Sequence, residues 1–417
     1  MSLHEMLFQL LFLSHAWQGG AETTQLVPQK QPSKKPPNNM IHSTVRYLRS
    51  TPPLSCHPST NKVILLRPDR FTSQQKTPWA GTAISTTYKK DLIPSLGTVA
   101  IGESWEFSCD PTFPSLLLTT GESLIDFIRD HAEAVLSPQL AAHSTTCEIL
   151  VKLLHAASPL SVQVHPEDGD PNLRPGECGK PESWLVLDAE PGAGLYLGFS
   201  QRLSKAALHT QLRSGADLTS LLQFIPVTRG DYFEIAPGVC HAIGPGVMIL
   251  EPQRLQPGKT GKTYRLWDWN RTYDPQGHYS ATGTPRELHI EESLAIIDPP
   301  KQYGPSFVQS LRRIAHKAPV GTAGNCWRYP PNPYYQTCLF ELLPTESCDI
   351  QIEGGYGVGL VLEGTLETQG TQLKKGQSFL LPFHASPLLV TATETALCAW
   401  VLPAQAQIQF LARKAPL

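Results

Sequence analysis

Polar and apolar residues alternate in the segment Ser161-Val162-Gln163-Val164-His165. Because successive side chains of a β-strand point to opposite faces, Ser161, Gln163 and His165 are expected to share one face. Three polar groups on one face of an otherwise apolar strand indicate a barrel with a polar lumen, and such a lumen typically holds a metal ion or a small ligand. This segment is therefore the starting point of a candidate metal site.

Two further residues of metal-binding types stand beside predicted strands. Glu182 precedes the apolar residues 184–187, and His241 follows a Pro-Gly turn signal. With the amide and the imidazole of the first segment they offer two nitrogens, one carboxylate and one amide oxygen. This donor set suits zinc and leaves a position for water or substrate. Other divalent metals accept the same donors, so the residues alone leave the identity of the metal open.

The composition is that of a folded chain with almost no net charge. Its 417 residues suggest two or three domains, 41% of them are hydrophobic, and the formal net charge is −2. Such a small charge gives no basic field for nucleic acid, and no apolar stretch is long enough to cross a membrane. The nine cysteines include no CxxC pair, which favours a reducing compartment and hence the cytoplasm. The sequence leaves the oligomeric state open.

Three regions differ in pattern along the chain. Residues 1–60 are rich in Pro, Lys, Asn, Ser and Thr, which predicts a flexible, disordered N-terminal extension. Residues 61–319 are strand-rich and contain the candidate ligands, with apolar residues at helical intervals near 201–225 that predict a small helical insertion. Residues 320–417 are strand-rich again and predict a separate C-terminal domain.

A strand-turn-strand pattern occurs in each of the two strand-rich regions. Residues 229–237 and 374–382 both run from a cation and Gly, through polar and aromatic residues, to an apolar stretch and Pro. This repetition predicts a mainly β protein built from two related β-barrels, or jelly rolls, in tandem. The second region has His384 but no Gln-x-His segment, so we expect it to be metal-free.

Six motifs extend this pattern along the chain, and their ordered set resembles type I phosphomannose isomerase, a family with the cupin fold. The motifs are Ile101-Gly-Glu-Ser-Trp-Glu106, Leu160-Ser-Val-Gln-Val-His-Pro166, Gly179-Lys-Pro-Glu-Ser-Trp184, Ile235-Ala-Pro-Gly-Val-Cys-His-Ala-Ile-Gly244, Thr263-Tyr-Arg-Leu-Trp-Asp-Trp269 and Arg286-Glu-Leu-His289. The likeness is strong over residues 62–300, weaker in the C-terminal barrel, and closest to the shorter bacterial form. The chain departs from the family by an insertion that includes residues 257–259.

The resemblance implies an aldose–ketose isomerase that interconverts mannose 6-phosphate and fructose 6-phosphate through a cis-enediol. It also implies one zinc ion per chain, held by the four candidates Gln163, His165, Glu182 and His241. The family's active-site arginine falls on Arg265, and residues that line its substrate pocket fall on Lys180 and Ser161. The implied substrate is therefore a small sugar phosphate.

The proton-transfer base is assigned from strand alternation. Within residues 247–253, Glu251 is expected on the same face as Val247 and Ile249, where it could face the lumen as the catalytic base. It could equally orient His241 or Arg265 through a hydrogen bond.

Two other functions compete with isomerisation. Another cupin metalloenzyme would usually lack Gln-x-His-Pro together with Lys-Pro-Glu. A non-catalytic sugar-binding or regulatory cupin would have little need for the complete set of ligands.

Overall fold

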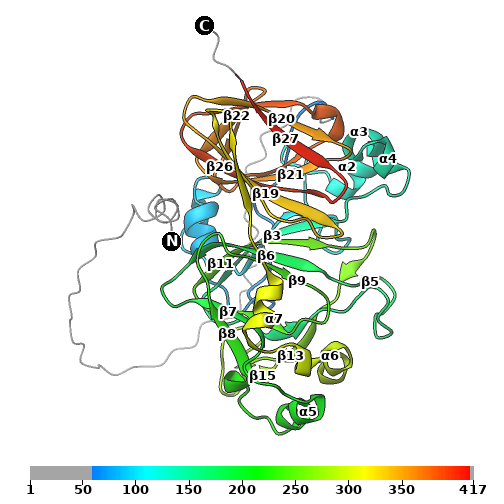
Figure 1. Ribbon diagram of the computed structural model, residues 1–417, viewed down its shortest axis with the longest axis vertical. Coiled ribbons are helices and arrows are strands. Elements are labelled where there is room, and N and C mark those ends of the chain that lie inside the picture. The colour runs from blue at the N-terminus through cyan, green and yellow to red at the C-terminus, as the bar shows by residue number, and fades with distance from the viewer. Residues whose placement is uncertain (1–58, 414–417) are drawn as a thin grey trace, which may run out of the picture. The chain divides into compact units, whose positions relative to one another are not determined.

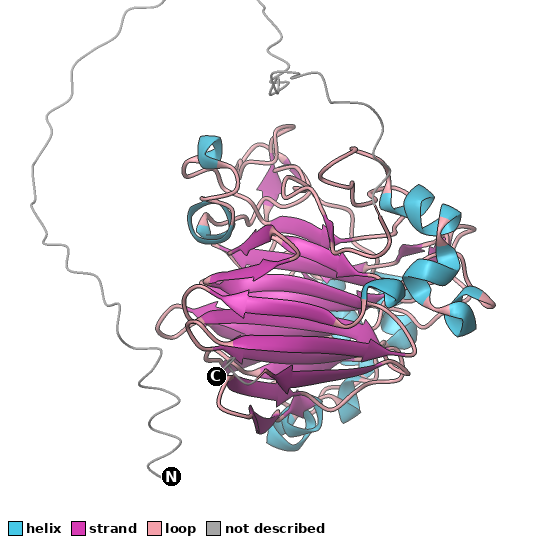
Figure 2. Ribbon diagram, turned by 90° about the horizontal axis from the view of Figure 1, so that it is seen from above, coloured by secondary structure: helices cyan, strands magenta, loops and turns pink. Residues whose placement is uncertain are grey.

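The structure is a computed structural model that describes residues 59–413 (Figure 1). The predicted N-terminal extension, residues 1–60, lies outside the described residues except for its last two positions. Layers of strands form the centre of the described chain, and short helices lie around them (Figure 2). Within residues 59–413, no helix is long and apolar enough to span a membrane.

Two antiparallel sheets carry the candidate ligands. The six-stranded sheet has the order β16-β9-β6-β11-β3-β2 and the five-stranded sheet has the order β13-β4-β10-β7-β8. The first sheet comprises β2 (Glu103–Phe107), β3 (Ile149–Ala156), β6 (Glu182–Ala189), β9 (Tyr232–Ile235), β11 (Val247–Arg254) and β16 (Arg312–Arg313). The second comprises β4 (Val162–Val164), β7 (Gly194–Phe199), β8 (Leu222–Pro226), β10 (His241–Ile243) and β13 (Tyr264–Trp267).

The central strands β3, β6 and β11 are buried on both faces, which explains their nearly continuous apolar sequences. On one face, Leu153, Leu185 and Leu250 join a core cluster that also contains residues of β21 and β26 in the C-terminal part. On the other face, Val186 and Ile249 belong to a different cluster, inside the first barrel. Burial of such a side chain contributes about 1.5–3 kcal/mol. One face of these strands therefore lies inside the first barrel, and the other face packs against the C-terminal sheets.

Two further sheets form the C-terminal part, coloured yellow to red in Figure 1 apart from the blue strand β1. The seven-stranded sheet comprises β1 (Ile64–Leu65), β17 (His316–Val320), β18 (Gly324–Arg328), β19 (Tyr335–Leu342), β21 (Gly357–Glu363), β24 (Ser378–Leu381) and β26 (Ala396–Pro403). The five-stranded sheet comprises β20 (Ser347–Glu353), β22 (Thr365–Thr368), β23 (Thr371–Lys374), β25 (Leu388–Ala392) and β27 (Gln407–Ala412). Strand β1 pairs with β24, so the start of the described chain is built into the C-terminal sheet.

Two pairs of short strands complete the β structure. Strands β5 (Glu177–Cys178) and β12 (Thr260–Gly261) run parallel, whereas β14 (Thr272–Tyr273) and β15 (Thr284–Pro285) are antiparallel. The mainly β architecture of tandem barrels that the repeated pattern predicts is confirmed.

The helices are short and stand at the ends and edges of the sheets. They are α2 (Leu124–Asp130), α3 (Ala132–Leu136), α4 (Pro138–Ala141), α5 (Lys205–Arg213), α6 (Ile290–Ile296) and α7 (Gly304–Leu311), with a π-helical turn η1 (Ile84–Tyr88) and 3₁₀ turns η2 (Pro94–Leu96), η3 (Thr219–Leu221), η4 (Pro299–Lys301) and η5 (Phe383–Ala385). In the predicted insertion, Ser204 caps α5 by accepting a hydrogen bond from the Ala207 amide. Gly215 then has φ +70°, a left-handed conformation that separates α5 from η3.

Candidate metal centre

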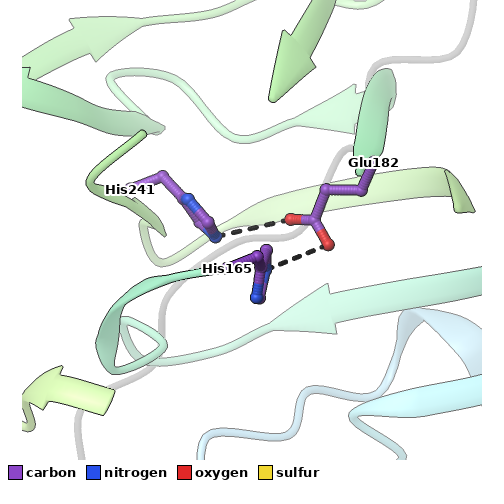
Figure 3. A group of neighbouring side chains, drawn as sticks. All are labelled: His165, Glu182 and His241. Atoms are coloured by element: carbon purple, nitrogen blue, oxygen red, sulfur yellow. Dashed lines mark ion pairs between the residues drawn. The ribbon is translucent and has the colours of Figure 1, made fainter. Parts of the chain in front are cut away.

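Three buried side chains converge between the two sheets of the first barrel. His165, Glu182 and His241 each offer one ligand atom, and these atoms lie within 4.8 Å of one another (Figure 3). His165 Nε2 is 3.2 Å from Glu182 Oε2, and His241 Nε2 is 3.4 Å from Glu182 Oε1. Within residues 59–413 this is the only such group of His, Cys, Asp and Glu residues.

The local strands explain the convergence. His165 follows the end of β4, and His241 begins β10, which pairs with β4 in an antiparallel register. Glu182 is the first residue of β6, which belongs to the other sheet. The two imidazoles and the carboxylate therefore approach each other from the two walls of the barrel.

Hydrogen bonds to the main chain fix the protonation of both imidazoles. His165 Nδ1 lies 3.2 Å from the Lys262 carbonyl oxygen, and His241 Nδ1 lies 2.8 Å from the Val239 carbonyl oxygen. A carbonyl only accepts, so each Nδ1 carries the hydrogen and each Nε2 presents a lone pair to the carboxylate. Nε2 of both histidines and Oε1 of Glu182 have no hydrogen-bond partner among the described residues. Lone pairs facing lone pairs in a buried site repel one another, and a cation among them turns this repulsion into ligation, so the donor set fits a divalent metal.

The electrostatics of the group favour the forms that bind metals. Burial lowers the pKa of His165, and burial also lowers the pKa of His241, to about 3. For Glu182, burial opposes ionisation, but the charged Lys180 beside it helps to hold the pKa of the carboxyl well below its usual value. At neutral pH the site therefore holds two neutral imidazoles and one carboxylate, as metal binding requires.

A cavity of about 530 Å³ opens beside this group. The predicted residues Ser161, Gln163, Lys180, Glu251 and Arg265 all line it. Strand alternation therefore places Ser161 and Gln163 on one side of the strand as expected, and the same cavity gathers the other three from β6, β11 and β13 or from residues beside them.

Gln163 is the fourth predicted ligand. It lies opposite His241 in the pairing of β4 with β10, and opposite Arg265 in the pairing of β4 with β13. Its amide thus stands on the wall that carries one imidazole of the metal group, beside the strand that carries the arginine. A role for Gln163 as a metal ligand stays a prediction.

Two polar groups outside the predicted ligand set hold the Glu182 carboxylate. Lys180 Nζ lies 3.1 Å from Glu182 Oε2, and Gln253 Nε2 donates to the same oxygen at 3.0 Å. Burial alone would lower the pKa of Lys180, but Glu182 raises it above its usual value, so the ammonium group stays charged. Sequence reasoning did not assign Gln253 to the site, although alternation along β11 puts it on the same face as Glu251.

Glu251 lies in the same cavity wall and is buried. Its Oε1 accepts a hydrogen bond from Trp184 Nε1 at 3.0 Å, and its Oε2 is 3.8 Å from Lys152 Nζ. Burial and the nearby Glu182 raise the pKa of Glu251 to about 7. Lys152 also lies 3.7 Å from Glu103 and was not identified from the sequence. The sequence feature that could have identified Lys152 is its position as a single cation within the apolar strand β3.

Arg265 also lines the cavity. One terminal nitrogen donates to the Glu287 carbonyl oxygen at 2.8 Å, and its Nε is buried and finds no acceptor within the described part of the chain. Burial and the neighbouring Arg286 lower the pKa of Arg265. Arg286 also lines the cavity, but Asp268 neutralises it through two hydrogen bonds of 2.7–2.8 Å. A partly buried guanidinium with an unused, buried donor is suited to an anionic ligand.

Comparisons with known proteins agree with this chemistry. Residues 71–188 match the family model described as phosphomannose isomerase type I, catalytic domain. A mannose-6-phosphate isomerase from Streptococcus mutans is 34% identical over 313 residues, which cover 73% of this chain and 88% of that protein.

Solved structures give the same result for the fold. A crystal structure of mannose 6-phosphate isomerase from Bacillus subtilis has a TM-score of 0.65 and 25% identity, and the match covers 81% of this chain and 99% of that one. A zinc-bound mannose 6-phosphate isomerase has a TM-score of 0.59 at 17% identity, again covering 81% of this chain and 99% of that one.

Proposed function

The chain belongs to the type I phosphomannose isomerase family, and from this premise we propose that it interconverts mannose 6-phosphate and fructose 6-phosphate at the cavity beside His165, Glu182 and His241. The observation that carries the proposal is the set of three converging, partnerless ligand atoms next to a cavity whose lining includes the cationic side chains Lys180 and Arg265. The ligand of the cavity is a small sugar phosphate.

The cofactor is one zinc ion per chain. His165, Glu182 and His241 would hold it, and we propose the Gln163 amide oxygen as the fourth protein ligand. When bound there, zinc supplies Lewis-acid polarisation of a sugar oxygen. Lys180 and Gln253 keep the Glu182 carboxylate in place, and the carbonyl oxygens behind the two histidines fix the tautomers that ligation needs.

Three residues bind and orient the sugar phosphate. Arg265 offers a planar fork and a buried free Nε–H to an oxyanion, either the phosphate or the oxygen that gains charge in the enediol. Lys180 adds a charged ammonium group at the cavity wall, and Ser161 offers a hydroxyl. Because these groups are fixed by packing before substrate arrives, they stabilise developing charge without reorganisation.

Glu251 is the proposed base. It takes the proton from one of the two carbons C1 and C2 and returns it to the other, with the cis-enediol between the two transfers. A carboxyl group whose burial raises its pKa to about 7 can accept and release a proton near neutral pH. The Trp184 indole N–H holds one carboxylate oxygen, which leaves the other for the proton.

Two further proposals concern the domains of the chain and the compartment in which it acts. We assign catalysis to residues 61–319 and propose that residues 320–417 form a cupin-like domain without metal, since the metal group and the lining of the cavity all fall in the first range. We also propose that the protein acts in the cytoplasm. The eight cysteines within the described residues are free, as a reducing compartment requires.

The test is a coupled assay with the purified chain. Mannose 6-phosphate is supplied, and fructose 6-phosphate is measured before and after treatment with a chelator and after zinc is restored. We expect turnover that the chelator abolishes and zinc recovers. Turnover that persists in the metal-free protein would refute the metal site. Sugar phosphate binding without turnover would favour a regulatory protein, and turnover of another substrate class alone would favour a different metalloenzyme.

A further inference from the structure

Tyr335, the first residue of β19, reaches from the C-terminal sheet to the back of the metal-binding sheet. Its hydroxyl donates to the Pro252 carbonyl oxygen at 2.9 Å and lies 2.9 Å from the Ser183 hydroxyl. Because the hydrogen of the tyrosine hydroxyl is used on the carbonyl, Ser183 must be the donor in the second bond. One side chain thus bridges two strands of another barrel.

Both partners are next to residues of the metal site. Ser183 follows Glu182 on β6, and Pro252 lies between Glu251 and Gln253 on β11. Successive side chains of a strand alternate between faces, so Ser183 and Pro252 point away from the lumen while their neighbours point into it. Tyr335 therefore bonds, on the face away from the lumen, to the two strand segments that carry Glu182, Gln253 and Glu251.

The ladder between β6 and β11 lacks one hydrogen-bond donor at this point. Glu182 is opposite Gln253, but the proline next to Gln253 has no N–H to donate to the ladder. A proline inside a central strand is unusual, because the lost ladder bond needs a replacement. The Tyr335 hydroxyl supplies a hydrogen bond to the carbonyl of that same proline and a second one to the facing strand.

The bridge is sealed from solvent. Tyr335 is 1% exposed and Ser183 is 0% exposed, so water cannot replace either hydroxyl. The Tyr232 hydroxyl is hydrogen-bonded to Ser183 and lies 3.1 Å from the Thr337 hydroxyl, which extends the network along β19. The network is part of the core cluster shared by the two barrels.

We propose that Tyr335 is a positioning residue for the metal centre, through which the C-terminal barrel sets the spacing of Glu182 against Gln253 and Glu251. The proposal rests on the metal site of the proposed function. On this proposal the C-terminal domain contributes to the reaction by positioning the metal ligands, although none of its own residues lines the cavity. Tyr335 acts through Ser183 and Pro252 and does not itself touch the cavity.

The experiment compares Tyr335→Phe with the matched variant Tyr329→Phe. Tyr329 is also a buried tyrosine of the C-terminal part, and its hydroxyl donates at 3.2 Å to the Gly230 carbonyl oxygen of the first barrel, away from the cavity. Both substitutions remove one buried hydroxyl and keep the ring. A merely structural contribution would therefore affect both variants alike.

The readouts are the zinc dissociation constant from competition with a chelator, the visible spectrum of the cobalt-substituted protein, and the unfolding temperature of the metal-free protein. For Tyr335→Phe we expect an affinity for zinc that is lower by about 10- to 100-fold and an altered cobalt spectrum, as for other losses of support behind a ligand. For Tyr329→Phe we expect wild-type values of both. Wild-type affinity and spectrum in Tyr335→Phe would overturn the proposal.

A second variant covers the case in which Tyr335→Phe does not fold. Ser183→Ala removes the other hydroxyl of the bridge, and it should also weaken zinc binding and change the cobalt spectrum. Wild-type metal binding in a folded Ser183→Ala would equally refute the proposal. A wild-type chain without zinc-dependent turnover would instead refute the proposed function, so the two failures are distinguishable.

Discussion

The indole N–H of Trp184 donates to Oε1 of Glu251 at 3.0 Å, across the pairing of β6 with β11 inside the first barrel. Both side chains are buried, and the Trp184 ring also meets the His241 ring edge-on at 5.2 Å between centroids. One aromatic residue thus packs against a metal ligand while it orients the proposed base. Glu251 and His241 are therefore held in one rigid arrangement, which would suit proton transfer beside a polarised oxygen.

Glu251→Gln should retain zinc and lower kcat by about 10²- to 10⁴-fold, the usual contribution of a general base. The amide keeps the shape and can still accept from Trp184, but it cannot take the proton. The measurement is kcat by the coupled assay, with zinc content determined on the same preparation. Near-normal turnover at full zinc content would show that Glu251 orients other residues instead.

The pH profile gives an independent check on Glu251. A base works only when deprotonated, so kcat/KM of the wild-type chain should fall as pH decreases through the pKa of Glu251, which burial raises to about 7. A divalent cation nearby favours the carboxylate, so the acidic limb should lie at or below that pH. The residual activity of Glu251→Gln should lack this limb. An unchanged limb in the variant would assign it to another group.

Metal removal should lower the stability of the fold. The ligands come from both sheets of the barrel, so zinc binds the folded chain and adds about 2.7 kcal/mol at a free concentration of 100 times its dissociation constant. Thermal unfolding should therefore shift upward when zinc is added to the metal-free chain, whereas His241→Ala should show little shift. Equal zinc-induced shifts in both proteins would place the metal elsewhere.

The local part of the site could be predicted from the sequence. Alternation over Ser161 and Gln163 needs only the geometry of one strand, and both side chains line the cavity as expected. The motif around His241 also predicts a turn followed by a strand, and β10 begins at that residue. The mainly β tandem fold could also be predicted, because each copy of the repeated pattern can be recognised within one short segment of the sequence.

The long-range part of the site could not be predicted in the same way. Gln253 reaches Glu182 across 71 positions of the sequence, and that contact depends on the register between β11 and β6. Tyr335 contacts Ser183 across 152 positions and from another barrel. Neither pair carries a spacing signal, since registers between distant strands arise from packing of the whole core.

Arg265→Lys should lower kcat/KM by about 100-fold and leave zinc content unchanged. Lysine keeps the positive charge but loses the planar fork and the buried Nε donor, which are the features suited to an oxyanion. Arg313→Lys is the matched control, because Arg313 pairs with Glu234 at 2.7 Å and lies outside the cavity lining. Steady-state kinetics of both variants decide the matter. A similarly small loss of kcat/KM in both variants would show that Arg265 has only a structural role.

Asp268→Asn should destabilise the metal-free chain by about 3 kcal/mol at pH 7, because it leaves two largely buried guanidinium groups without their shared carboxylate. Asp268 is 4% exposed. Its Oδ1 accepts hydrogen bonds from a terminal nitrogen of Arg286 at 2.7 Å and from a terminal nitrogen of Arg271 at 2.5 Å. Asp349→Asn is the control, since Asp349 pairs at 2.6 Å with an Arg413 side chain that is 55% exposed, and such pairs contribute about 1 kcal/mol or less.

The cost of Asp268→Asn should also depend on pH in a defined direction. Burial opposes ionisation of Asp268, but Arg286 and Arg271 hold the pKa of the carboxyl below its usual value. A depressed folded pKa gives a contribution that is present above the unfolded pKa of about 3.9 and is lost as pH falls through the folded value. Urea unfolding in the presence of chelator should therefore give a difference between wild type and Asp268→Asn that is constant from pH 7 to pH 5 and shrinks below about pH 4. A difference that grows on acidification would mean that the arginines do not stabilise the ionised carboxylate.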